Sequence, residues 1–500
     1  MFDAYDRRPL RPTVVHIGPG VFHRAHQAAY SDALLRSGAT VGAFWGVSLR
    51  SSEVRDALVP DDFVYDVVER STSAGSEAGG VDERVRSVGS ILGIDVLPEG
   101  AEVVLARLVD PAVTVVTVTV TEHGYCAVEP GGALDTDRPE VAHDLGRPEA
   151  PRSLPGLLVE SLVRRRAAGL APFTVASCDN LPSNGDAIRR VVCDLAECRD
   201  PALATWIGGT VAFPSSMVDR MVPSMADDPR AATPRCAPRS TRVLTEPFSQ
   251  WVLTDTFPFG RPDWGDVGVE LVGDVHLHEQ AKLRILNAAH SALAYWGLLC
   301  GYDHIWQSAA DPALASAARE LIELEAIPSL DTPPGWDLHR YAEVVLERFA
   351  NRALPYTNAK VAGDGSQKLP VRLMPTVREL VRRGRPAPRS AQLLAAWAAT
   401  MFGPSSARFG LSDPALFDGD AGDVPGRSRR FGGAPEPTVT ALLGLPGFGL
   451  PDVPGRRGFV DAVSDGARAL WQADARPALS GLLSQDATPN ATPKARRGES

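Results

Sequence analysis

The sequence lacks a signal peptide, an excess of positive charge and any apolar run long enough to cross a membrane. Its most strand-like segment, residues 112–122, is short and rich in threonine, whereas a membrane helix needs roughly 20 apolar residues. Residues 1–12 contain no apolar core of the kind that signal peptides have. The net charge of -10 argues against nucleic acid as a partner, which would require a concentrated basic surface. The sequence therefore predicts a cytoplasmic protein with no membrane and no nucleic-acid partner.

The chain also has few cysteines, only six in 500 residues. None forms a Cys-x-x-Cys pair, and Cys193 and Cys198 have no cluster of histidines or cysteines beside them. A disulfide framework and a structural zinc site are therefore not expected. A zinc-dependent alcohol dehydrogenase would need a ligand set with an open position, and no such set is recognisable. The sequence predicts no bound metal.

What is present is an ordinary globular composition, 44% apolar and 22% charged, arranged in two parts. The first part alternates strand-like and helix-like segments, which favours an α/β fold with a parallel, doubly wound sheet; its strand-like segments are 13–18, 42–49, 112–122, 171–180 and 210–220. After about residue 275 helical periodicity dominates. We predict a dinucleotide-binding domain over 1–274, an all-helical domain over 275–485, and a disordered tail over 486–500, which is almost free of apolar residues. The segment 404–436, rich in Gly, Pro, Ser and Asp, is predicted to be a long loop.

The first strand-like segment runs into the sequence HIGPGVFHRAH. Gly18 and Gly20 stand between a strand and a helix, where a dinucleotide fold needs bare backbone for the pyrophosphate. We predict that they bind the cofactor together with the next residues, Val21 and Phe22. The third glycine of the fingerprint would fall at His23, so a plain tight turn is the alternative.

Two charged residues follow the second strand-like segment. Glu53 is the best-placed carboxylate to bind the ribose hydroxyls, and it would favour NAD over NADP by repelling a 2′-phosphate. Arg50 also belongs to the predicted cofactor site, and its guanidinium could instead accept that phosphate. The simpler interpretation of Glu53 is an acid favoured at a helix N-terminus.

The segment AKLRILNAAH, residues 281–290, places polar groups in a small, apolar helical run. At 100° per residue around the helix axis, with Lys282 at zero, Glu279 lies at about 60°, His290 at about 80° and Asn287 at about 140°. These four groups could line one pocket wall. A lysine of lowered pKa can remove a hydroxyl proton, and an asparagine amide can stabilise the alkoxide. The alternative is a solvated helix edge.

Two further clusters follow strand-like segments. Asn180 lies in SCDNLPSNG, where a turn or helix cap is the simpler interpretation. Asp219 and Arg220 lie in FPSSMVDRMVP, where a buried ion pair is the simpler interpretation.

Seven segments in this order resemble the polyol-specific long-chain dehydrogenase/reductase family, which includes mannitol 2-dehydrogenase and fructuronate reductase. They are GPGVFHRAHQAAYSDALL, TVTEHGYC, FTVASCDNLPSNG, FPSSMVDRMVP, GRPDWGDVGVELVGDV, KLRILNAAHSALAYWG and DGSQKLPVR. The matches recur from about residue 12 to about residue 480. The resemblance implies a metal-free NAD enzyme with an N-terminal Rossmann-type domain and a mostly helical C-terminal domain.

The family's KxxxxNxxH element matches Lys282, Asn287 and His290. By that match Lys282 is the general acid/base, Asn287 and Asn180 form the oxyanion pair, and His290 orients the substrate. Glu279 matches a carboxylate through which the proton leaves to solvent.

Substrate contacts are also carried over from the resemblance. Asp219 and Lys368 match residues near the substrate, and Lys360 stands where mannitol dehydrogenases can carry an arginine. Lys360, Arg372 and Arg284 could instead pair with a substrate carboxylate, although a lysine does not replace an arginine fork. The predicted substrate is therefore a linear polyol and its ketose, D-mannitol and D-fructose first, with reduction of a hexuronate (fructuronate or tagaturonate) by NADH as the alternative.

A protein that kept the fold but lost catalysis is a further alternative, which the complete Lys282, Asn287, His290 and Asn180 set disfavours. The expected partners are small molecules only: a sugar alcohol, a ketose or a hexuronate. The chain is expected to be a monomer or a weak oligomer.

Overall fold

The computed structural model describes residues 2–73, 80–129, 131–224, 241–413, 416, 434–472 and 474–484. These residues form two compact units, Met1–His278 and Glu279–Ser500, called here the N-terminal and the C-terminal unit. The division falls after His278, and the sequence places the domain boundary after residue 274. The predicted tail and most of the predicted loop over 404–436 lie outside the described residues.

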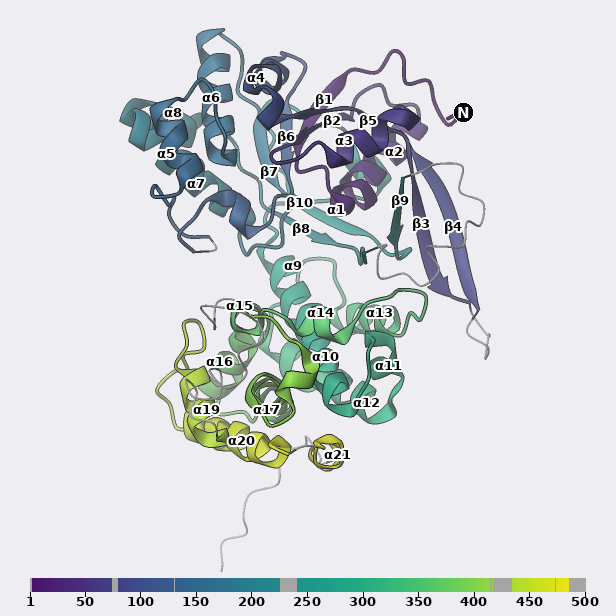
Figure 1. Cartoon of the computed structure of the whole chain (residues 1–500), viewed down its shortest axis with the longest axis vertical. Coiled ribbons are helices and arrows are strands. Elements are labelled where there is room, and N and C mark those ends of the chain that lie inside the picture. Colours follow the sequence, from purple (N-terminus) through teal and green to yellow (C-terminus); the bar gives the residue numbers. More distant parts are fainter. Residues whose placement is uncertain are drawn as a thin grey trace, which may run out of the picture. The chain divides into compact units, whose positions relative to one another are not determined.

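A five-stranded parallel sheet forms the centre of the N-terminal unit, in the order β5-β2-β1-β6-β7 (Figure 1). Its strands are β1 (Pro12–Ile17), β2 (Ala43–Ser48), β5 (Ile91–Val96), β6 (Val115–Val118) and β7 (Thr174–Ser177). The strand order reverses direction between β1 and β6, and ligands of such sheets bind outside the strand ends at that point. The predicted Rossmann-type sheet is confirmed.

Helices cover both faces of this sheet, so its strands are continuous apolar runs. Val15 and Val116 belong to one core, together with side chains of α6 (Leu154–Ala167) and α7 (Asn184–Arg199). Their chain neighbours on the same strands, Val14 and Val115, belong to a second core with Trp251 and Trp264. The period of two along a strand separates the two cores.

The remaining strands were not predicted correctly. The segment 210–220 was expected to continue the parallel pattern, but β8 (Ser216–Asp219) pairs antiparallel with β10 (Gln250–Thr254), which in turn pairs with β11 (Glu270–Val272). A third sheet contains the hairpin of β3 (Tyr65–Thr72) and β4 (Val81–Val88) beside β9 (Arg242–Thr245). A short apolar run indicates a buried strand but does not specify its partner.

The C-terminal unit is helical, and the part of it that the structure describes contains no strand. Its helices are α11 (Ile305–Ala310), α12 (Pro312–Glu320), α13 (Leu338–Phe349), α14 (Asn358–Ala362), α15 (Gly365–Arg372), α16 (Met374–Arg382), α17 (Pro388–Phe402), α19 (Pro435–Leu443), α20 (Gly455–Leu470) and α21 (Arg476–Leu483). The helix α10 (Ala288–Cys300) contacts α14 and α17. All its residues are buried, as expected of a helix that is apolar on every side. None of the helices in the described residues combines the length and apolar character of a membrane span.

One long helix leads into α10 and changes its winding on the way. It begins as α9 (His276–Ala281), continues as a π-helical segment, Lys282–Asn287, and ends as α10. A second π-helical segment, Leu321–Ala326, follows α12. Single π-helical turns inside α-helices are frequent at functional sites.

Candidate functional site

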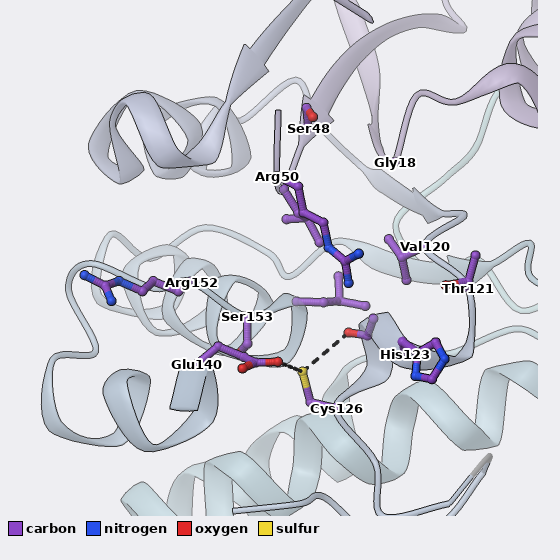
Figure 2. Close-up of a pocket in the computed structure, with 13 residues that line it drawn as sticks. Gly18, Ser48, Arg50, Val120, Thr121, His123, Cys126, Glu140, Arg152 and Ser153 are labelled. Carbon is purple, nitrogen blue, oxygen red and sulfur yellow. Dashed lines mark hydrogen bonds between the residues drawn. The ribbon is translucent and has the colours of Figure 1, made fainter. Parts of the chain in front are cut away.

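A cavity of about 510 Å³ opens in the N-terminal unit at the carboxyl ends of the central strands (Figure 2). Its walls are the residues that follow β1, β2 and β6, the turn at 123–126, Glu140 and the segment 152–154. The cavity therefore lies at the point where the strand order reverses, which is the binding place of a dinucleotide in this type of sheet.

Gly18, at the end of β1, is required for steric reasons. Its φ is +92°, and a Cβ atom there would lie 2.0 Å from the carbonyl oxygen of Thr119. Gly20 is the N-cap of the short helix α1 (Val21–Ala25), and no comparable contact constrains it. The predicted strand–turn–helix is thus present, with bare backbone at the cavity wall.

His23 occupies the place of the third glycine of the fingerprint and is fully buried. Its ring stacks on that of His16 in β1, with centroids 3.4 Å apart, and meets Phe44 edge-on. A glycine at this place normally allows close packing of helix on strand, and here two stacked rings make that contact. Burial lowers the pKa of His16 to about 3 and holds that of His23 well below its ordinary value, so both rings are neutral.

The other predicted cofactor residues differ in their relation to the cavity. Arg50 lines it, and its guanidinium extends into it from the end of β2 (Figure 2). Glu53 is exposed in the first turn of α3 (Glu53–Leu58) and is not part of the cavity wall. Val21 is 48% exposed, and Phe22 stacks on His26. Among the two charged candidates, only Arg50 faces the space where a cofactor would lie.

Two aspartates that are not among the predicted site residues hold the cavity walls. Asp179 accepts hydrogen bonds from the backbone N–H groups of Val120 and Thr121 at 3.0 Å. Asp144, on α5 (Pro139–Gly146), accepts those of Arg152 and Ser153 at 2.8 and 2.9 Å. A carboxylate that binds backbone amides leaves no spacing pattern in the sequence, so no motif could have identified either residue.

The turn held by Asp179 is strained. Thr121 has a φ of +66°, a conformation that costs a β-branched residue roughly 1–3 kcal/mol and persists only where its surroundings impose it. Tyr125 helps to hold the Asp179 carboxylate against this turn, since its hydroxyl donates to that carboxylate at 3.0 Å.

Asn180 and Asp219 lie near strand ends in the N-terminal unit. Asn180 is exposed directly after Asp179. Asp219 is buried at the end of β8. Arg220 forms a buried ion pair with Glu69 at 2.6 Å and also donates to the carbonyl oxygen of Ala25.

The predicted catalytic residues of the C-terminal unit occupy one stretch of helix. Lys282 is 7% exposed and Glu279 8%, so neither belongs to a solvated helix edge. Lys282 and Asn287 are the first and last residues of the π-helical segment, in which the N–H of Ala288 bonds to the carbonyl of Leu283, five residues back. In an α-helix Asn287 would lie about 140° from Lys282 around the axis. The wider π-helical turn brings residues five apart closer to one face.

His290 follows on α10 and is held by aromatic rings. Its ring stacks on Phe349 with centroids 4.9 Å apart and lies 5.7 Å from the ring of Tyr356. These contacts fix the plane of the imidazole, which suits a residue that orients another molecule.

The predicted substrate residues of the C-terminal unit, Lys360, Lys368 and Arg372, lie on α14 and α15. Lys368 donates to the carbonyl oxygen of Gly363 at 2.6 Å, and burial, with the charge of Arg372, lowers its pKa. Arg372 donates to the hydroxyl of Ser291, the residue after His290. Lys360 is exposed. Arg284 donates to the carbonyl oxygen of Ser329, so its guanidinium is used within the helical packing.

Within the described part of the chain, no three His, Cys, Asp or Glu side chains come together in a way that could hold a metal ion. Five of the cysteines are free thiols, and Cys236 lies outside the described residues.

Comparison with known proteins gives consistent matches over both units. Residues 12–266 match the mannitol dehydrogenase Rossmann domain, and residues 274–419 match the mannitol dehydrogenase C-terminal domain. The chain is 38% identical over 496 residues to D-mannonate oxidoreductase of Escherichia coli, covering 96% of this chain and 97% of that protein. It is 38% identical over 421 residues to mannitol 2-dehydrogenase of Phaeosphaeria nodorum, covering 82% and 73%.

A solved structure extends the likeness to three dimensions. The ternary complex of Pseudomonas fluorescens mannitol 2-dehydrogenase with NAD and D-mannitol is 33% identical, with a TM-score of 0.81, and covers 97% of this chain and 96% of that one. The predicted fold class, a Rossmann-type domain followed by a helical domain, is thereby confirmed, as is the family resemblance. The chain belongs to the mannitol dehydrogenase family and is an oxidoreductase of that family.

Proposed function

We propose that this chain uses NAD to interconvert a linear polyol and its ketose, D-mannitol and D-fructose first, with Lys282 as general acid/base. The observation that carries the proposal is the burial of Lys282 at the start of a π-helical segment that ends at Asn287. The solved relative that binds NAD and D-mannitol supports the choice of cofactor and substrate.

The N-terminal cavity suits a dinucleotide because its rim is bare backbone at Gly18, where a Cβ atom would collide with Thr119. In this proposal Gly18 and Gly20 bind the pyrophosphate. Arg50, which follows β2, also binds the dinucleotide. NAD, when bound, supplies the acceptor for the hydride that leaves the carbinol carbon.

The chain's own residues handle the proton and the developing charge. The Nζ of Lys282 removes the hydroxyl proton during oxidation and returns it during reduction. Burial favours this role, since a desolvated amine more readily exists in its neutral form. The amides of Asn287 and Asn180 donate to the alkoxide oxygen without changing protonation state. Glu279, three residues before the lysine, takes the proton toward solvent, and His290 orients the substrate hydroxyl.

The substrate residues are assigned by the same proposal. Asp219, Lys360, Lys368 and Arg372 bind the hydroxyl groups of a polyol. Lys368 is fixed by backbone carbonyls and Arg372 by Ser291, so both present nitrogens in restrained positions.

A second candidate is the interconversion of a hexuronate and an aldonate by the same machinery. The similarity to D-mannonate oxidoreductase favours it, because the identity is 38% over 97% of that protein, compared with 33% for the mannitol 2-dehydrogenase of known structure. Lys360, Arg372 and Lys368 would then pair with the substrate carboxylate.

One set of initial rates separates the two candidates. The full chain is assayed with D-mannitol and D-mannonate plus NAD, and with D-fructose and D-fructuronate plus NADH, at matched concentrations. Faster turnover of mannitol and fructose supports the first candidate. A preference for the acids that disappears in Lys360→Ala or Arg372→Ala overturns it in favour of the second. Binding of NADH with no turnover of any of these compounds contradicts both.

A further inference from the structure

The carboxylate of Asp179 connects two parts of the N-terminal unit. It accepts hydrogen bonds from two consecutive backbone N–H groups, those of Val120 and Thr121, and from the hydroxyl of Tyr125. Val120 and Thr121 are both part of the cavity wall. The residue that follows Asp179 in the chain is Asn180, the predicted oxyanion donor. One side chain therefore restrains the cavity wall and also precedes a proposed catalytic group.

The turn held by Asp179 also sets the position of the glycine at the end of β1. Gly18 lies against the backbone of Thr119, so tightly that a Cβ atom would be 2.0 Å from its carbonyl oxygen. The N–H of Thr119 bonds to the carbonyl oxygen of Ile17. The carboxylate, the strained turn and the glycine consequently form one continuous set of contacts at the strand ends.

A second carboxylate, that of the buried Asp144, gives a matched case on the other wall. Asp144 is 1% exposed and binds the N–H groups of Arg152 and Ser153, which also line the cavity. Unlike Asp179, it does not adjoin a residue proposed to act in the reaction. The pair therefore allows a general effect on the cavity to be separated from an effect specific to Asp179.

We propose that Asp179 is a positioning residue for the oxidoreductase reaction: its carboxylate holds the turn at 120–121 so that the cavity can bind the dinucleotide, and it holds the chain that presents Asn180. The part concerning Asn180 rests on the proposed function. The part concerning the cavity does not, because it needs only dinucleotide binding.

The protonation of Asp179 supplies an independent readout. Burial raises the pKa of its carboxyl to about 6, against the opposing effect of the hydrogen bonds from Val120, Thr121 and Tyr125. The other titratable groups that interact with it are Glu122, which raises its pKa, Tyr125 and the buried thiol of Cys178. Below about pH 6 the carboxyl gains a proton and loses acceptor capacity for the turn, so the wild-type affinity for NAD should fall in that range.

The test is calorimetric titration of the full chain with NAD between pH 5 and pH 8. For the wild type we expect Kd to rise about tenfold from pH 7 to pH 5, the equivalent of 1.4 kcal/mol. In Asp179→Asn, Kd should be raised about tenfold at pH 7 and should no longer change with pH. Asp144→Asn should raise Kd but keep the wild-type pH dependence.

Asp32→Asn is the control for mere loss of a buried carboxylate. Asp32 is fully buried and accepts the N–H of Gly89 at 3.0 Å, but it does not line the cavity. Its replacement should lower the melting temperature and leave both Kd and its pH dependence as in the wild type.

Wild-type NAD affinity and pH dependence in Asp179→Asn would overturn the proposal. If that variant does not fold, Tyr125→Phe decides, since it removes one hydrogen bond to the carboxylate: a raised Kd supports the proposal and an unchanged Kd overturns it. Absence of sugar turnover by the wild type would refute the proposed function alone, because the NAD titration does not depend on the sugar.

Discussion

The predicted functional residues of the two units are of different kinds. In the N-terminal unit the cavity is shaped by the backbone at Gly18 and by two aspartates that bind amide N–H groups. In the C-terminal unit the predicted catalytic groups are side chains on one helix, from Glu279 to His290. A side-chain site can be recognised from residue types and spacing, whereas a backbone site depends on conformations that the sequence expresses only indirectly.

This contrast separates chemistry from binding. Changes on the helix should alter turnover and leave NAD affinity unchanged, and changes in the loops of the cavity should do the reverse. A carboxylate that binds backbone amides occurs in both units but has a different role in each. Asp179 shapes a cavity, while Glu325 accepts the N–H groups of Arg389 and Ser390 in the first turn of α17.

The largest effect is expected for Lys282→Ala. Loss of the general acid/base should lower kcat about 10³-fold, with the Kd for NAD within twofold of the wild type. Steady-state rates and calorimetric titration measure the two quantities. Arg284→Ala is the matched control, because Arg284 lies on the same π-helical segment but donates to the carbonyl oxygen of Ser329, and it should retain turnover within about threefold. Near-wild-type kcat in Lys282→Ala at every pH would remove the lysine from the mechanism.

Glu325→Gln should change stability without changing the site. Burial raises the pKa of Glu325 to about 7, so between about pH 4.5 and 7 the folded protein keeps a proton that the unfolded chain has released. The contribution of Glu325 to stability therefore falls as pH rises through this window, by roughly 3 kcal/mol in total. In Glu325→Gln the melting temperature should vary less between pH 5 and pH 7, and the Kd for NAD should stay as in the wild type. If the melting temperatures of the wild type and Glu325→Gln changed equally with pH across this range, the raised pKa of Glu325 would be contradicted.

Gly18→Ala should affect binding and not chemistry. The positive φ and the contact with Thr119 force the loop to move, and we expect Kd for NAD to rise about 100-fold, equivalent to about 2.7 kcal/mol. Gly146→Ala is the control, since no atom lies near a Cβ at that place. At saturating NAD the variant should recover most of its kcat, and a kcat that stays low would show that the loop also serves the chemical step.

The smallest effect concerns the two charged residues after β2. Arg50 extends into the cavity and Glu53 does not line it, so Arg50→Ala should raise Kd about fivefold for NAD and further for NADP. Glu53→Gln should change either value less than twofold. Titrations with NAD and NADP measure these values. A marked gain in NADP affinity for Glu53→Gln would show that the carboxylate of Glu53 does select NAD over NADP.

The sequence predicted the order of the two domains, the central parallel sheet and the helix that carries Lys282. These rest on periodicity, on a glycine between strand and helix, and on the KxxxxNxxH spacing. The antiparallel pairing of β8 was missed because the sequence of a four-residue apolar strand does not determine which strand it pairs with. The replacement of the third glycine became intelligible only when His23 was found stacked on His16.

The geometry of the helix that carries Lys282 also could not be predicted from the sequence. At 100° per residue Asn287 lies about 140° from Lys282 around the helix axis. The π-helical winding brings the two closer, and this local change in winding cannot be recognised from the periodicity of the sequence. Asp179 and Asp144 were missed for a related reason, because their partners are amide groups that every residue possesses.

Because of the π-helical winding, we expect the helix to tolerate the loss of one residue better than a regular α-helix would. Removing one residue from an ordinary helix rotates everything beyond it by about 100°. Excision of one residue from 283–286 would instead let the backbone close as a regular α-turn, with the amine and the carboxamide now four apart and still on a common side. The π-helical segment thus contains one residue more than a regular α-helix needs. A chain without that residue would show whether the reaction depends on the π-helical turn itself or only on the amine and the carboxamide lying on the same side of the helix.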